Sequence, residues 1–119
     1  MARILVVDDE PAQRFMLRRI FEQAGHQVRD AGDGAEALRA VRESAPDLVV
    51  TDMMMPVMDG GELIRQLRCG PATGGIPILA ASGDPNLAVG ADAVISKPYR
   101  QERLIEVADE LLRKGHDLL

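Results

Sequence analysis

Short strand-like runs alternate with amphipathic segments along the whole chain, and this alternation limits the fold more than any other feature. Repeated β–α units form parallel sheets with helices on both faces. Most of the runs are continuously apolar, which is typical of strands buried on both faces, while the more polar run 27–31 suits an edge. Strands are predicted at residues 3–7, 27–31, 47–51, 76–81 and 93–96. Helices are predicted over 11–24, 35–44, from near Asp59, and over about 100–114.

One connection between two predicted strands is too short for a normal helix. Only seven residues separate Ser82 from Gly90, and Pro85 and Gly90 bracket four of them. A crossover between parallel strands usually takes a dozen or more residues and contains a helix of several turns. The sequence therefore predicts a turn or a single helical turn here.

Composition narrows the class of protein. The 119 residues suffice for one domain, 1–119, and 46% of them are hydrophobic. A net charge of -5 argues against direct, sequence-independent nucleic-acid binding. The single cysteine, Cys69, excludes an internal disulfide, and no apolar stretch approaches the length of a membrane span. Because the chain enters a strand-like run directly, without a visible signal peptide, we expect a cytoplasmic protein without membrane contact.

Chemically active side chains stand at the ends of the predicted strands. Asp8 and Asp9 follow the first strand, and Asp52 follows the third. Ser82 and Lys97 follow the last two. The carboxyl ends of parallel strands share one edge, where ligands bind, so these residues are expected to meet. Helix capping, ordinary turns and a solvated lysine are the simpler explanations of each residue taken alone.

Converging carboxylates repel one another unless a cation lies among them. Oxygen ligands without histidine or cysteine favour Mg²⁺, which shares its coordination with phosphate oxygens. An aspartate such as Asp52 can act as a nucleophile that forms an aspartyl-phosphate, with Lys97 neutralising phosphoryl charge. Pro98 permits a cis peptide bond directly after Lys97.

Taken together, these motifs resemble the receiver domain of two-component response regulators, the chemotaxis-regulator-like fold. The resemblance covers residues 3–113 and implies a flavodoxin-like, doubly wound sheet with strand order 2-1-3-4-5. The residues that carry it are Val6-Val7-Asp8-Asp9, Asp33-Gly34, Asp47 to Pro56, Met58-Asp59-Gly60, Ser82, Gly90-Ala91-Asp92 and Lys97-Pro98-Tyr99.

The resemblance implies a phosphorylation switch rather than a turnover enzyme, with self-catalysed phosphoryl acceptance and slow autodephosphorylation. Asp52 would accept the phosphoryl group from a histidine kinase or a histidine phosphotransfer protein. Asp9 and Asp52 would ligate Mg²⁺, Asp8 would act mainly through a water, and Met54 would contribute its backbone carbonyl. Lys97 would pair with the phosphoryl group.

Signal output is where the chain departs from the resemblance. Ser82 would be the switch hydroxyl, but the usual fourth helix is shortened or missing, and Val94 stands where a switch aromatic is usual. No output domain follows the last predicted helix, so the chain is read as a single-domain regulator or an excised receiver. The kinase, the downstream protein target and the oligomeric state, with a homodimer among the options, stay open.

Two other functions are kept as alternatives. A phosphohydrolase of the haloacid-dehalogenase type also uses a strand-end aspartate, Mg²⁺ and a lysine, but it needs a second aspartate where this chain has Met54. A phosphorylation-independent interaction module would fit the shortened fourth helix. It would leave the complete set of acidic, hydroxyl and lysine residues unexplained.

Overall fold

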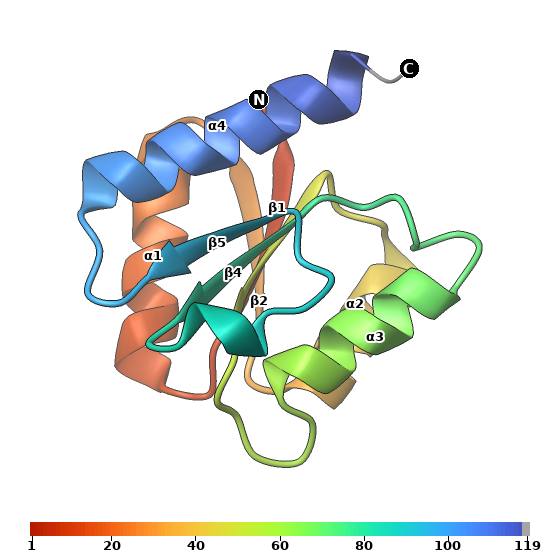
Figure 1. Cartoon of the computed structure of the whole chain (residues 1–119). Helices are drawn as coiled ribbons and strands as arrows, with labels where there is room; N and C mark the ends of the chain where they lie inside the picture. The colour runs from red at the N-terminus through yellow and green to blue at the C-terminus, as the bar shows by residue number, and fades with distance from the viewer. Residues whose placement is uncertain (118–119) are drawn as a thin grey trace.

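Five parallel strands form one sheet in the order β2-β1-β3-β4-β5. The computed structural model describes residues 1–117, so the predicted domain end at residue 119 lies outside the described residues. The strand order expected from the resemblance is confirmed (Figure 1). The strands are β1 (Arg3–Val7), β2 (Gln27–Ala31), β3 (Leu48–Asp52), β4 (Ile78–Ser82) and β5 (Ala93–Ser96).

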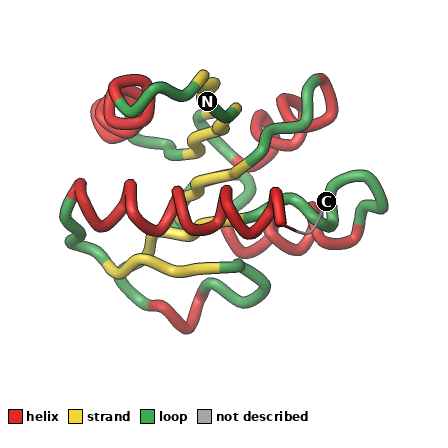
Figure 2. The backbone as a smooth tube through the Cα atoms, turned by 90° about the horizontal axis from the view of Figure 1, so that it is seen from above, coloured by secondary structure: helices red, strands yellow, loops and turns green. Residues whose placement is uncertain are grey.

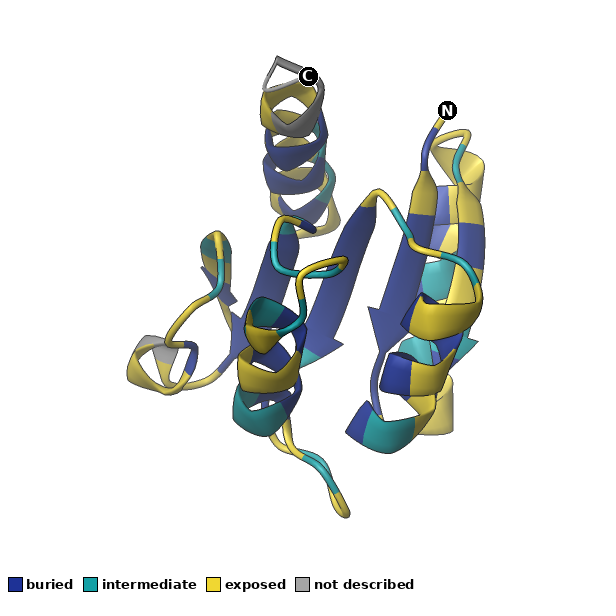
Figure 3. Ribbon diagram, turned by 90° about the vertical axis from the view of Figure 1, so that its right-hand side faces the viewer, coloured by how far each residue is buried: buried dark blue, intermediate teal, exposed yellow. Residues whose placement is uncertain are grey.

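Helices cover both faces of this sheet, as predicted. They are α1 (Pro11–Gln23), α2 (Gly34–Glu43), α3 (Gly60–Cys69) and α4 (Gln101–Asp117). One buried apolar cluster lies between the sheet and α1 with α4, and a second lies between the sheet and α2 with α3. Figure 3 shows the strands as the buried layer between helices whose outer faces are exposed.

Local sequence signals explain most element boundaries. Pro11 occupies the first turn of α1, where no amide donor is needed. Asp33 and Asp59 are the N-caps of α2 and α3, and each side chain accepts a hydrogen bond from the backbone nitrogen three residues later. These caps place the two helices where the sequence predicted them.

Several element boundaries differ from the prediction by one to three residues. β3 includes Asp52 itself, one residue beyond the predicted end. β4 begins at Ile78 rather than at 76, because Pro77 has no amide proton for the ladder and the nitrogen of Ile76 donates to the Thr73 carbonyl in the preceding turn. α4 extends to residue 117, three residues beyond the predicted end.

The connection between β4 and β5 contains only a 3-10 helix, Pro85–Leu87, here called η1. Figure 2 shows it as one short helical turn at the rim of the molecule. The prediction of a vestigial fourth helix is therefore confirmed, and α4 is the last helix of the chain. Val94 on the edge strand β5 is 38% exposed. Within the described residues, no helix is long and apolar enough to cross a membrane.

Candidate functional site at the carboxyl edge of the sheet

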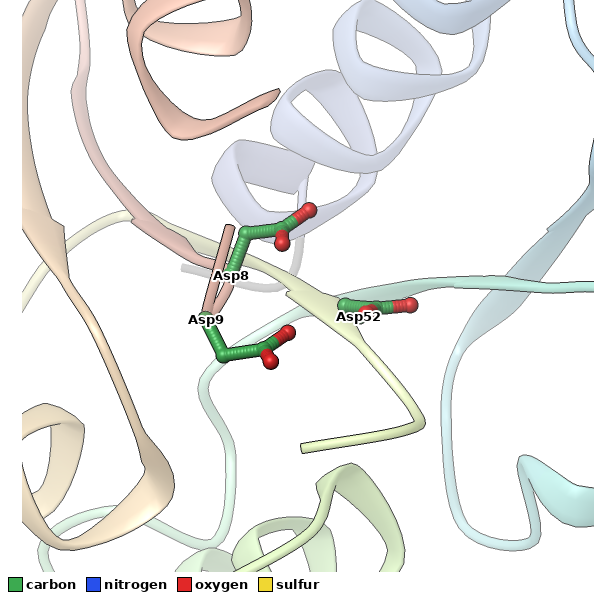
Figure 4. A group of neighbouring side chains, drawn as sticks. All are labelled: Asp8, Asp9 and Asp52. Carbon is green, nitrogen blue, oxygen red and sulfur yellow. The ribbon is translucent and has the colours of Figure 1, made fainter. Parts of the chain in front are cut away.

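Three carboxylates converge where β1 and β3 end. Val7 and Thr51 are partners in the ladder, so Asp8 and Asp9 emerge beside Asp52. One carboxylate oxygen from each of the three lies within 4.8 Å of the other two, as Figure 4 illustrates. Asp8 is buried, Asp9 is exposed, and the Asp52 side chain is 11% exposed. The expectation that residues at the carboxyl ends of these strands lie close together thus holds for the three aspartates.

Backbone and side-chain hydrogen bonds hold Asp8 from several directions. Its nitrogen donates to the Ala31 carbonyl at 3.1 Å, and its own carbonyl accepts from Nη1 of Arg14 at 2.9 Å. Its Oδ1 accepts from the backbone nitrogen of Glu10 at 3.0 Å. Glu10 is the N-cap of α1 and makes no side-chain capping bond, so helix capping does not account for the acidic pair. The contact of Arg14 with the Asp8 carbonyl was not predicted from the sequence.

Lys97 forms an ion pair with Asp52. Its Nζ donates to Oδ1 of Asp52 at 2.7 Å, and the same oxygen accepts from the backbone nitrogen of Met53 at 2.9 Å. The backbone nitrogen of Lys97 donates to the Ser82 carbonyl, and the Lys97–Pro98 peptide bond is cis. Burial lowers the pKa of Lys97, but the hydrogen bond and charge of Asp52, together with Asp8, outweigh burial and leave that pKa raised.

The cluster carries more negative than positive charge. Burial is the largest influence on Asp8 and raises its pKa, the hydrogen bond from Glu10 lowers it, and the charge of Asp52 raises it again, with a raised net result. Three carboxylates against one ammonium leave unneutralised charge that a cation would offset. An all-oxygen set fits Mg²⁺ rather than a metal that prefers nitrogen or sulfur ligands.

Ser82 ends β4 at the same edge, and its hydroxyl bonds to the backbone of the turn that follows. Ser82 is buried, and its Oγ accepts from the backbone nitrogen of Asp84 at 3.0 Å and donates to the Asp84 carbonyl at 2.8 Å. The simpler explanation, a turn-forming serine, therefore describes its contacts here. Met54 follows β3 with a 71% exposed side chain, and the role of its carbonyl as a ligand stays a prediction. Tyr99 packs against the apolar cluster under α1 and α4.

The loop from β3 to α3 turns back tightly beside Asp52. The nitrogen of Gly60 donates to the Met53 carbonyl at 3.0 Å. A side chain at Gly60 would collide with the Asp52 carbonyl and would lie 2.8 Å from the Met53 Cα. At the loop tip, Val57 has φ of 69° and is 88% exposed, within a turn closed by the Met58 nitrogen and the Pro56 carbonyl. The loop therefore depends on close backbone approach at one position and on a strained residue at another.

Comparison with known proteins agrees with this geometry. The family model described as "Response regulator receiver domain" matches residues 4–109. The DNA-binding response regulator MtrA of Mycolicibacterium smegmatis is 40% identical over 122 residues, which cover 97% of this chain and 52% of the relative. The response regulator MprA of Mycobacterium sp. (strain KMS) is 42% identical over 120 residues, 94% of this chain and 51% of the relative. The chain thus spans about half the length of these relatives.

Solved structures show the same fold. The signal receiver domain of a signal transduction histidine kinase from Syntrophus aciditrophicus superposes with a TM-score of 0.90 at 35% identity, covering 96% of this chain and 92% of that one. The chemotaxis response regulator CheY4 of Vibrio cholerae superposes with a TM-score of 0.87 at 31% identity, covering 93% and 98%. Each likeness extends over nearly the whole domain.

Proposed function

This chain belongs to the response regulator receiver domain family, and on that basis we propose that Asp52 accepts a phosphoryl group in a Mg²⁺-dependent reaction. We propose a histidine kinase or a histidine phosphotransfer protein as the donor, and a change in binding to a protein target as the output. The observation that carries the proposal is the convergence of Asp8, Asp9 and Asp52 beside the ammonium of Lys97.

Contacts at Asp52 favour one of its oxygens as the nucleophile. Among residues 1–117, Lys97 and the Met53 nitrogen both bond to Oδ1, which leaves Oδ2 to form the new bond to phosphorus. The bond from phosphorus to the donor nitrogen breaks with its electron pair going to that nitrogen, and a proton taken up by the imidazole from solvent restores the donor histidine. Lys97 stays close enough to Asp52 to balance charge on the transferred group.

Asp8, Asp9 and Asp52 would hold Mg²⁺, with the Met54 carbonyl as a further ligand. When bound, Mg²⁺ would neutralise phosphoryl oxygens and remove the mutual repulsion of the carboxylates. Asp8 is the most buried of the three, so its charge is the hardest to accommodate without a cation.

The structural context weighs against the two alternatives. A dehalogenase-type hydrolase needs an acid two residues after the nucleophile, and Met54 offers an exposed thioether there. A phosphorylation-independent module would have no need for an intact cluster with a paired lysine.

Mass measurement separates the three functions. Incubation with acetyl phosphate and Mg²⁺ should add about 80 Da to the intact chain, the mass of one phosphoryl group. Asp52→Asn should abolish the adduct, while Glu43→Gln, which makes the same carboxylate-to-amide change on an exposed residue of α2, should keep it. Continuous release of inorganic phosphate without an adduct would indicate the hydrolase. No adduct with any donor would indicate the interaction module.

We propose that residues 1–119 act as one receiver domain in the cytoplasm, without membrane contact. The relative MtrA is described as DNA-binding. For this domain we propose protein partners and no direct nucleic-acid contact, because its net charge of -5 opposes binding to phosphate backbones. A homodimer is one option for the output and can be checked by light scattering before and after phosphorylation.

A further inference from the structure

Arg14 connects three segments next to the acidic cluster. It lies in the first turns of α1, and its Nη1 donates to the backbone carbonyl of Asp8 at 2.9 Å. Its Nε lies 3.3 Å from Oδ2 of Asp30, near the end of β2. A Cβ on Gly32 would lie 3.3 Å from Nη1, so a glycine there leaves room for the guanidinium. One side chain thus joins α1, the end of β2 and the segment that follows β1.

These contacts determine the path of the backbone that carries the first two carboxylates. The Asp8 nitrogen is held by Ala31 and the Asp8 carbonyl by Arg14, so the peptide bond leading to Asp9 is held by a group that touches neither carboxylate. We propose that Arg14 is a positioning residue for the cation site, which keeps Asp8 and Asp9 converging on Asp52. The inference rests on the proposed function, in which this cluster binds Mg²⁺.

Arg18 provides a matched comparison one helical turn further along α1. Its Nη1 lies 3.6 Å from the same Asp30, and its Nε lies 3.4 Å from Glu22. Among the described residues, Arg14 is the one of the two that hydrogen bonds to Asp8. Arg14 and Arg18 therefore share their charge, helix and the partner Asp30, while Arg14 alone of the two bonds to the Asp8 carbonyl and Arg18 pairs with Glu22 instead.

Positioning and simple electrostatics predict opposite effects. Removing a cation near an acidic site strengthens its attraction for Mg²⁺, and this would apply to either arginine. Loss of a positioning bond weakens binding, because the ligands no longer converge before the ion arrives. The direction of change in the Mg²⁺ dissociation constant therefore distinguishes the two effects.

The test measures Mg²⁺ binding to the unphosphorylated full chain by NMR titration of backbone amides at fixed ionic strength. Arg14→Ala should raise the dissociation constant by about tenfold, the lower end for loss of a group that orients metal ligands. Arg18→Ala should leave it within about twofold or lower it, because charge removal alone favours the cation. Arg14→Lys keeps the charge and a donor for the Asp8 carbonyl but replaces the rigid two-sided guanidinium by a single ammonium, and it should give an intermediate constant.

Thermal melts of each variant show that it is folded, and Arg14→Lys carries the comparison if Arg14→Ala does not fold. Equal Mg²⁺ affinity in wild type, Arg14→Ala and Arg14→Lys would overturn the positioning role, whatever happens to the melting temperature. Equal weakening in Arg14→Ala and Arg18→Ala would also overturn it. Failure of the wild-type chain to bind Mg²⁺ would instead refute the proposed function on which the inference rests.

Discussion

Replacing Asp8 by asparagine is expected to stabilise the metal-free protein. Asp8 is 4% exposed and lies with one carboxylate oxygen within 4.8 Å of oxygens of Asp9 and Asp52. Asparagine has nearly the same shape, and its Oδ1 can still accept the hydrogen bond from the Glu10 nitrogen. The substitution therefore removes charge while it keeps packing and the local turn.

The gain can be estimated from these distances. Two like charges about 4.8 Å apart repel by roughly 3.5 kcal/mol at an effective dielectric constant of ~20. Asp8 is repelled by the charges of Asp9 and Asp52 and attracted by that of Lys97, so the net repulsion is about that of one pair of like charges. Water screens exposed Asp9, and the weaker hydrogen bond of a neutral acceptor costs about 1 kcal/mol. We expect a net gain of about 1–2 kcal/mol in the free energy of unfolding, or about 5 °C in Tm for a domain of this size.

The pH dependence has a definite sign. Because the pKa of Asp8 is raised in the folded state, the folded protein holds this proton more tightly than the unfolded chain does. The stability that protonated Asp8 contributes is present below the ordinary pKa of 3.8 and is lost as pH rises through the raised value. The stability difference between Asp8→Asn and wild type should therefore widen from acid towards neutral pH.

Calorimetry or circular dichroism melts with and without Mg²⁺ test this. Wild type should gain Tm with Mg²⁺, and Asp8→Asn should gain much less because it lacks one ligand charge. Glu43→Gln removes the same charge from an exposed pair on α2 and should change Tm by little under either condition. If metal-free Asp8→Asn melts at or below the wild-type temperature at neutral pH, the carboxylates do not repel one another as described and the electrostatic reasoning fails.

Three further predictions concern Asp52, Lys97 and the loop after β3. Val57→Gly should raise the urea midpoint of unfolding by an amount equivalent to about 1 kcal/mol, because it removes a β-branched side chain from a residue with φ of 69°. Val89 is also exposed but lies outside such a conformation, so Val89→Gly should lower the midpoint. A lower midpoint for both variants would show that Val57 is not strained. Gly60→Ala should lower the free energy of unfolding, measured with a chemical denaturant, by more than about 2 kcal/mol, because its methyl group would overlap the Asp52 carbonyl. Gly75→Ala, where a Cβ would have nothing within 4 Å, should leave it nearly unchanged. Similar losses at both sites would contradict the close approach at Gly60. Lys97→Gln should slow phosphorylation by acetyl phosphate by about 100-fold, measured in a mass-spectrometric time course, because it removes the cation beside Oδ1 of Asp52. An unchanged rate would exclude a direct role for the ammonium.

Much of the site could be predicted because, in a parallel sheet, the residues that end each strand lie at the same edge. Once β1, β3 and β5 were assigned, the residues at their carboxyl ends had to share one edge. An error of one residue at the end of β3 did not matter, since Asp52 faces the cluster as the last residue of the strand. The convergence of acids and lysine thus follows from topology alone.

Contacts that depend on side-chain direction were beyond this reasoning. The Ser82 hydroxyl bonds to the backbone of Asp84, a choice set by the local turn and not by the strand it ends. Arg14 looked like one of several arginines on an amphipathic helix. Its bond to the Asp8 carbonyl arises because α1 packs over β2 and brings the side chain across the chain segment after β1. A turn at Ser82 was among the simpler explanations considered from the sequence, whereas the Arg14 contact has no sequence pattern that could have predicted it.

The short crossover between β4 and β5 shows how the fold replaces the missing helix. Arg68 on α3 donates to the carbonyls of Gly74, Ile76 and Gly90, and it forms an ion pair with Asp92 at 2.6 Å. Asp92 in turn accepts from the backbone nitrogen of Ile78 at 2.7 Å.

The guanidinium of Arg68 therefore joins the start of β4 to the segment that leads into β5. Of the three carbonyl groups, that of Gly90 lies in the crossover, and Arg68 gives it a hydrogen bond of the kind that a longer helix would supply internally. The crossover is held from its far end, at Arg68, while the end near Ser82 is held by the serine hydroxyl and the Asp84 backbone. If Asp52 is phosphorylated as proposed, a movement of the Ser82 hydroxyl towards the phosphoryl group would break its two hydrogen bonds to Asp84. The Arg68 contacts involve neither Ser82 nor Asp84, so we predict that such a movement would leave them intact.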